Sequence, residues 1–114
     1  MILTFGGDGA RQPVRNYSIG GFQVAMSAVD SLRRQLAAEL GSYGIRVLTL
    51  ESGGIIEGMP DMPENIVKMV VEPTLLGRAA SFAEVGKAAV FAASDMASCM
   101  TGCSINITCG SSVN

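Results

Sequence analysis

The first side chains that could perform chemistry are three cysteines near the end of the chain. Cys99, Cys103 and Cys109 follow the spacing C-x3-C-x5-C, and the sequence contains no histidine. A closed zinc site takes about four ligands from Cys, His or carboxylates, which three thiols on and beside one short strand do not supply. We therefore predict no metal site and interpret the cysteines as buried, small apolar side chains in a reduced compartment. Their odd number also argues against a disulfide framework.

Glycine clusters follow two of the apolar runs, and the first is a candidate site because a glycine-rich turn that leads from a strand into a helix can bind phosphate. The first cluster is Gly6-Gly7-Asp8-Gly9, and the second is Ser52-Gly53-Gly54. A long glycine-rich loop follows the first cluster where a phosphate site would need a helix. We interpret the first cluster as a flexible turn, and the second as the end of a strand.

The elements that would position these residues alternate between strands and helices. Apolar runs predict strands at 1–5, 45–50 and about 103–108, and a long loop at 6–21. Helical spacing predicts helices at 22–40, near 63–71 and from Ser81 to about Ala93. The sequence Ser81-Phe-Ala-Glu84 is typical of a capping box. Alternation at these lengths favours a parallel sheet with right-handed crossovers, so we predict one α/β domain over 1–114.

The longest predicted helix carries a stripe of apolar residues with alternating steps of three and four, which we expect to face the sheet, with a contact of part of it to another subunit as the alternative. Arg33, Arg34 and Glu39 fall outside that stripe. Its members are Phe22, Ala25, Val29, Leu32, Leu36 and Leu40.

Composition excludes several classes of function. Hydrophobic residues make up 48% of the 114 residues and charged residues 16%, which is enough apolar material for a packed core. The net charge is -2 and the basic residues are scattered, which argues against a nucleic-acid groove. No apolar run reaches the roughly 18 residues of a membrane-spanning helix, so we expect no membrane partner and a cytoplasmic location.

Segments 28–50 (AVDSLRRQLAAELGSYGIRVLTL) and 77–110 (GRAASFAEVGKAAVFAASDMASCMTGCSINITCG) resemble the C-terminal half of short-chain dehydrogenases/reductases. Members of that family have a helix ending in LA-x-E-L, followed by a strand that begins with G-I-R-V. Nearer the C-terminus they have a helix ending in F-x-A-S-D and then a strand that follows T-G. The resemblance covers about residues 2–114. It implies a partial Rossmann-like fold with the last three parallel strands, and NAD or NADP as cofactor, without indicating which of the two.

The family resemblance also implies a catalytic Tyr and a Lys four residues later, with a Ser after the preceding strand. In 14–29 (VRNYSIGGFQVAMSAV) the chain resembles an atypical branch in which a G-G-F element stands at the Tyr position. Phe22 then occupies the Tyr position and Met26 the Lys position, and no Ser occurs before Ser18. Since no tyrosine of the chain precedes a lysine by four residues, we assign no catalytic residue.

One cofactor-binding feature of the family is partly matched after the second strand. Members of the family have Pro-Gly at this point, and this chain has Ser52-Gly53 followed by Gly54-Ile55. We predict Gly53 and Ile55 as cofactor-binding residues, while Glu57 replaces a Thr that often contacts the nicotinamide. An ordinary turn before a substrate loop is the alternative. The family's glycine-rich turn lies in its first half, so this chain alone is not expected to bind the cofactor well.

Two hypotheses of different class follow. The chain is a fragment or truncated member of an NAD(P)-dependent oxidoreductase family, without dehydrogenase activity as it stands. Alternatively it is a non-catalytic binding module, because the helix at 22–40 and the final helix and strand correspond to subunit contacts in the resembled family. The second hypothesis predicts a homo-oligomer, or association with a related subunit.

Overall fold

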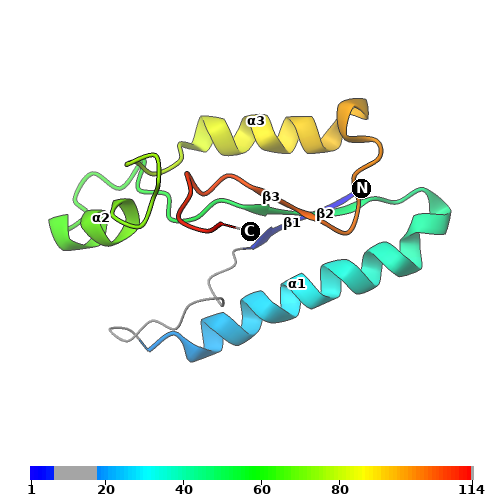
Figure 1. The fold of residues 1–114 in the computed structure, drawn as a ribbon, viewed down its shortest axis with the longest axis horizontal. Coiled ribbons are helices and arrows are strands. Elements are labelled where there is room, and N and C mark those ends of the chain that lie inside the picture. The colour runs from blue at the N-terminus through cyan, green and yellow to red at the C-terminus, as the bar shows by residue number, and fades with distance from the viewer. Residues whose placement is uncertain (7–17, 114) are drawn as a thin grey trace.

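Three parallel strands form the centre of the fold in the computed structural model, which describes residues 1–6 and 18–113 (Figure 1). The strands are β1 (Ile2–Gly6), β2 (Val47–Glu51) and β3 (Ser104–Asn106), and β2 lies between the other two. The β1–β2 register pairs Ile2 with Val47, and the same parallel sense continues from β2 to β3. This arrangement confirms the predicted α/β fold with parallel strands.

Helices cover both faces of this small sheet. Helix α1 (Gly20–Leu40) lies along one face and α3 (Phe82–Ala93) along the other, while α2 (Glu64–Val71) lies beyond one end of the strands (Figure 1). Two short 3-10 turns follow α1 and α3. In the described part of the chain, no helix combines the length and apolar character needed to cross a membrane.

The core is built around β2, all of whose residues are buried. Val47, Leu48 and Leu50 have no exposed surface, as expected for a central strand with helices on both sides. The Thr4 and Thr49 hydroxyls are hydrogen-bonded at 2.7 Å between β1 and β2. On the opposite side, Nη2 of Arg46 donates to the Ala92 carbonyl at 2.8 Å and joins α3 to the sheet.

The predicted capping box at the start of α3 is confirmed. The backbone N–H of Glu84 donates to the Ser81 hydroxyl at 3.1 Å, and the Ser81 N–H donates to the Glu84 carboxylate at 2.9 Å. Two backbone donors that a helix N-terminus leaves unpaired are thereby satisfied, which fixes where α3 begins.

The predicted apolar stripe of α1 is wrong in part. Phe22 and Leu32 are 55% and 54% exposed, and Ala25 is exposed as well, whereas Arg33 is only 7% exposed. Nη2 of Arg33 lies 2.6 Å from Oδ1 of Asp30, one turn earlier, so a paired guanidinium takes the inward position. The helix has apolar residues on two sides, and spacing alone did not identify the side that faces the sheet.

The interpretation of the cysteines as buried side chains is also wrong. Cys99 is exposed, Cys103 and Cys109 are half-buried, and all three are free thiols. Cys99 lies in the turn that precedes β3, and Cys109 lies just after β3 with φ of +55°. These positions in connecting segments, outside the strands and helices, explain their exposure.

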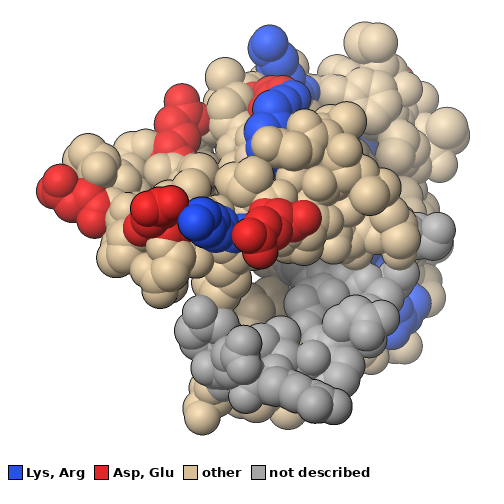
Figure 2. Space-filling model, turned by 60° about the vertical axis from the view of Figure 1, so that its left-hand side comes forward, with Lys and Arg blue, Asp and Glu red and all other residues tan. Residues whose placement is uncertain are grey.

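The surface beside α2 carries charges of both signs. On the face shown in Figure 2, acidic and basic side chains are interspersed and most of the surface carries neither. One pair on α2 joins Nζ of Lys68 to Oε1 of Glu64 at 3.1 Å, and both side chains are well exposed. Such mixed, solvated pairs contribute little to stability. This face therefore presents no extended patch of one sign.

Candidate cofactor and ligand site

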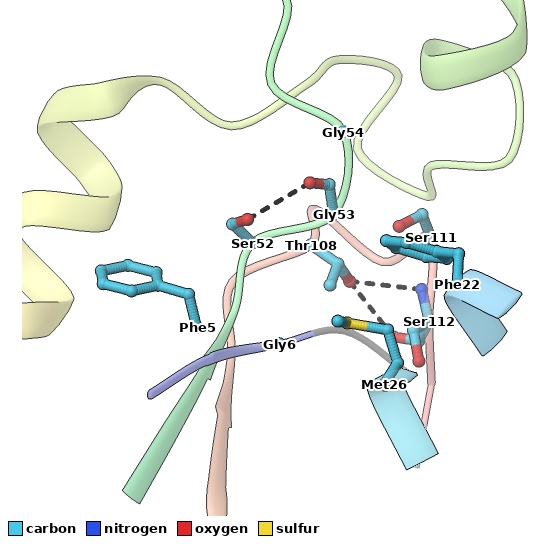
Figure 3. A pocket seen from close by; sticks show the side chains of 10 residues that line it. All are labelled: Phe5, Gly6, Phe22, Met26, Ser52, Gly53, Gly54, Thr108, Ser111 and Ser112. Atoms are coloured by element: carbon cyan, nitrogen blue, oxygen red, sulfur yellow. Dashed lines mark hydrogen bonds between the residues drawn. The ribbon is translucent and has the colours of Figure 1, made fainter. Parts of the chain in front are cut away.

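A hollow of about 530 Å³ lies at the carboxyl ends of β1 and β2 (Figure 3). Ligands of open α/β sheets bind in crevices at this end of the strands, and a hollow of this size is typical of a small-molecule site. The lining residues come from the strand ends, the first turns of α1 and the segment after β3. They are Phe5, Gly6, Phe22, Met26, Ser52, Gly53, Gly54, Thr108, Ser111 and Ser112.

Gly53, one of the two predicted cofactor-binding residues, borders this hollow. Its φ is +63°, and a Cβ at this position would lie 3.2 Å from Oγ of Ser111 and 3.3 Å from Cβ of Thr108. Glycine is therefore required both by the left-handed backbone and by the close neighbours. Ile55, the other predicted residue, is not among the residues that line the hollow.

The next residue fixes the direction in which the chain leaves the hollow. A Cβ at Gly54 would lie only 2.7 Å from Cγ1 of Val70, which belongs to α2. The segment after Gly53 thus passes directly against α2. Farther along, the Glu57 carboxylate accepts a hydrogen bond of 2.5 Å from the backbone N–H of Phe82 at the start of α3. Glu57 therefore serves the helix N-terminus and is not among the residues around the hollow.

A small hydrogen-bond network shapes the wall formed by the segment after β3. The buried Thr108 hydroxyl donates to Oδ1 of Asn106 at 2.7 Å and accepts from the Ser112 N–H at 3.2 Å. Nδ2 of Asn106 donates to the Ser112 carbonyl at 2.8 Å. These bonds fold residues 106–112 into a tight loop, which places Ser111 and Ser112 along the hollow (Figure 3).

Helix α1 supplies an apolar wall. Phe22 and Met26 lie one turn apart near its start, and both line the hollow together with Phe5 of β1. These are the two positions at which the resemblance places a Tyr and a Lys. Among the described residues that line the hollow, every side chain is apolar, a hydroxyl or absent, and none is ionisable. The described part of the lining therefore provides no group for proton transfer near neutral pH.

Of the two predicted site residues, Gly53 lines the hollow and Ile55 does not, and the prediction included none of Phe5, Thr108, Ser111 and Ser112. The signal that was available is positional, because all carboxyl ends of parallel strands meet at one edge of the sheet. Residues directly after β3 should therefore have been candidates along with those after β2. No described group of three or more His, Cys, Asp or Glu side chains is arranged to hold a metal ion.

A second polar cluster fixes the segment that leads into α3. Nη1 and Nη2 of Arg78 donate to the two carboxylate oxygens of Glu84 at 2.9 and 2.7 Å. This bidentate contact, with the Ser81 N–H as second donor, lowers the pKa of Glu84 from 4.5 to about 2. The same contact raises the pKa of Arg78.

This depressed pKa predicts an acid-sensitive contribution to stability. Since the folded-state pKa lies below the unfolded value, the contribution is present above pH 4.5 and is lost as the pH falls toward about 2. A Glu84→Gln variant should lose stability near neutral pH and show a shallower loss between those values than the unaltered chain. Thermal denaturation at a series of pH values across this range measures the stability of both chains, and Glu72→Gln serves as the control on an exposed carboxylate. An unchanged acid response in Glu84→Gln would contradict the assignment.

The described lining matches only part of what a nicotinamide dinucleotide requires. The open backbone at Gly53 and the apolar wall fit the flat, uncharged dihydronicotinamide ring of the reduced cofactor. No Lys or Arg occurs among the described lining residues. The residues present thus fit one end of the cofactor and do not fit its diphosphate.

Comparison with known proteins decides the family. A family model described as enoyl-(acyl carrier protein) reductase matches residues 1–112. The chain belongs to this family of short-chain dehydrogenases/reductases. It is 34% identical over 113 residues to the enoyl-[acyl-carrier-protein] reductase [NADH] of Bacillus cereus, covering 96% of this chain and 43% of that protein. The reductase of the same name from Nostoc is 37% identical over 108 residues, which cover 89% of this chain and 40% of the Nostoc protein.

Solved structures of this short-chain reductase family share the fold. Sorbitol-6-phosphate 2-dehydrogenase from Erwinia amylovora superimposes with a TM-score of 0.84 at 26% identity, covering 99% of this chain and 48% of that one. The enoyl-(acyl-carrier-protein) reductase of Anaplasma phagocytophilum, in complex with NAD, superimposes with a TM-score of 0.82 at 26% identity. The match covers 96% of this chain and 42% of the Anaplasma chain. The chain thus spans less than half the length of the relatives that it matches.

Proposed function

We propose that this chain acts as the C-terminal part of an NAD(P)-dependent short-chain oxidoreductase and lacks dehydrogenase activity as it stands. One observation carries the proposal. The hollow at the strand ends brings Gly53 together with Phe22 and Met26, and its described lining holds no ionisable side chain. The chain would supply the nicotinamide-side wall of a site, without the proton donor that carbonyl reduction requires.

The relatives support the choice of cofactor. The Bacillus cereus relative is named as an NADH-dependent reductase, and the Anaplasma structure contains NAD. In this proposal the Gly53 backbone lies against the nicotinamide and Ile55 supports that segment from outside the hollow. The phosphates would be bound by sequence that the relatives possess and that has no match in this chain. A cytoplasmic location is part of the same proposal.

The proposal is tested by titrating the purified 114-residue chain with NADH and with NADPH while following nicotinamide fluorescence. Because the described lining has no cation for the diphosphate, we expect no saturable binding up to about 1 mM, the upper end of ordinary KM values. Light scattering on the same sample establishes that the protein is not aggregated. Saturable binding at micromolar cofactor would overturn the proposal.

The alternative is a non-catalytic module that associates with itself or with a related subunit. It is favoured by the outward face of α1, where Phe22, Val24 and Leu32 are each more than half exposed. It is also favoured by Phe5, which is 63% exposed on β1, an outer strand of the described sheet. Co-expression with the Bacillus cereus relative discriminates, since stable co-purification favours the module and independent behaviour disfavours it.

A further inference from the structure

We propose that a groove beside the start of α2 is a docking surface for a basic, amphipathic helical segment of another protein (Figure 1). The groove has a volume of about 400 Å³ and shares none of its described lining residues with the hollow at the strand ends. The inference therefore goes beyond the proposed function and does not depend on cofactor binding. The groove is lined by Met59, Pro60, Asp61, Met62, Pro63 and Ile66.

The groove offers a wall of adaptable apolar side chains. Met59 is 55% exposed, while Met62 and Ile66 are half-buried and continue the apolar surface onto α2. Methionine side chains are unbranched and polarisable, so a surface that contains them adapts to apolar side chains of different shapes. A large apolar side chain of a partner would remove this surface from water, which favours association.

The backbone around the groove is held in place before a partner binds. The N–H of Met62 donates to the Met59 carbonyl at 3.3 Å, and the N–H of Ile66 donates to the Pro63 carbonyl at 2.9 Å. Pro60 and Pro63 restrict the backbone further, because their rings fix the φ angle. A partner therefore meets a surface that is already formed, and less conformational entropy is lost on binding.

The charges around the groove select the sign of the partner. Asp61 forms part of the wall and is exposed. Residues 59–72 include three acidic residues and one lysine, and this Lys68 is paired with Glu64. Within the described chain, Asp61 and Glu72 have no basic side chain within ion-pair distance. Although charges of both signs are present, the excess at the groove is negative, which attracts a basic partner and repels an acidic one.

An apolar groove with an acidic rim favours an amphipathic helix over other occupants. Such a helix presents apolar residues at spacings of three and four, with charged residues beside them. An anionic lipid surface would be repelled by the acidic rim. A second copy of this chain has a net charge of -2 and is disfavoured for the same reason.

The test uses a fluorescein-labelled peptide of leucine and lysine, about 14 residues or roughly four helical turns long, with its leucines at helical spacing. A matched peptide has glutamate in place of each lysine. Fluorescence anisotropy with the full chain should show saturable binding of the lysine peptide and at least about tenfold weaker binding of the glutamate peptide. Binding of the lysine peptide should weaken between about 0.1 M and about 1 M salt, because screening shortens the Debye length from about 10 Å to about 3 Å.

Two variants test the apolar and the acidic parts of the groove separately. Met59→Ser should weaken binding of the lysine peptide about fivefold or more through loss of apolar contact. Asp61→Asn should weaken it about two- to fivefold through loss of one charge. The matched controls, Met96→Ser and Asp95→Asn, change exposed residues of the turn after α3, outside the groove. Both should leave the dissociation constant within about twofold.

All four altered residues are exposed, so each variant is expected to fold, and circular dichroism checks this. Equal effects of the groove and control variants, equal binding of the two peptides, or no saturable binding of the lysine peptide to the folded chain would overturn the inference.

Two further measurements address the other occupants of the groove. Binding to vesicles of phosphatidylcholine and phosphatidylserine that is lost in Met59→Ser would assign the groove to a lipid surface. A dimer in light scattering that is lost in the same variant would assign it to a second copy. Either result would also overturn the inference, whereas neither affects the cofactor titration, which tests the proposed function at a different site.

Discussion

A Gly110→Ala variant is expected to lose about 2–5 kcal/mol of unfolding free energy. Gly110 has φ of +85°, and a left-handed backbone costs an alanine about 1–2 kcal/mol. The added Cβ would also lie 2.7 Å from Cβ of Leu75 and 3.1 Å from its backbone nitrogen. Because a backbone atom cannot rotate away, overpacking adds about 1–3 kcal/mol.

Gly77→Ala is the matched control for this prediction. Gly77 has φ of +67°, yet a Cβ there would meet nothing within 4 Å. It should therefore lose only the backbone part, about 1–2 kcal/mol. Urea denaturation of both variants and the unaltered chain measures the difference. Equal losses in the two variants would show that the contact with Leu75 does not determine the position of the loop.

The second large effect concerns catalysis. In a chimera, this chain replaces the matching segment, 43% of the length, of the Bacillus cereus enoyl-[acyl-carrier-protein] reductase. NADH oxidation with that enzyme's enoyl substrate is expected to fall about 100- to 10,000-fold, the usual contribution of general acid–base groups. The reason is that Phe22 has no ionisable proton and Met26 carries no charge, at the positions that the family resemblance assigns to the Tyr and the Lys.

A reversal provides the control for that chimera. Phe22→Tyr combined with Met26→Lys introduces the Tyr and Lys of the resembled family, one helical turn apart on α1. Activity should rise above that of the unaltered chimera, provided that circular dichroism shows both proteins to be folded. A chimera that oxidises NADH at the rate of the relative, with Phe22 and Met26 in place, would contradict the prediction.

Much of the fold could be predicted because apolar runs and cap residues act locally. Ser81 and Glu84 form the capping box that their spacing indicated, and the strands lie within two residues of their expected bounds. The orientation of α1 could not be predicted, since the helix has apolar residues on two sides. The inward position of Arg33 depends on its ion pair with Asp30 and on the sheet beneath, which hydrophobic periodicity does not describe.

The site was predictable only where one residue type has a single physical use. Gly53 was identified from its match to the Pro-Gly pattern of the resembled family, and its positive φ and close neighbours explain why glycine stands there. Ser111 gave no such signal, since its position depends on the bonds that Thr108 makes with Asn106 and Ser112. The loop predicted over 6–21 is wrong at both ends, because Gly6 ends β1 and Gly20 begins α1. Residues 7–17, which include Tyr17 and the rest of the first glycine cluster, lie outside the described residues.

In the proposed function, this chain forms one wall of a nicotinamide site that other sequence must complete. Equilibrium binding of NADH to the chimera, measured beside the isolated chain and the Bacillus cereus relative, tests it most directly. The account predicts saturable binding to the chimera and the relative, and none to the isolated chain at the same concentrations. Saturable binding to the isolated chain, or none to a folded chimera, would contradict it.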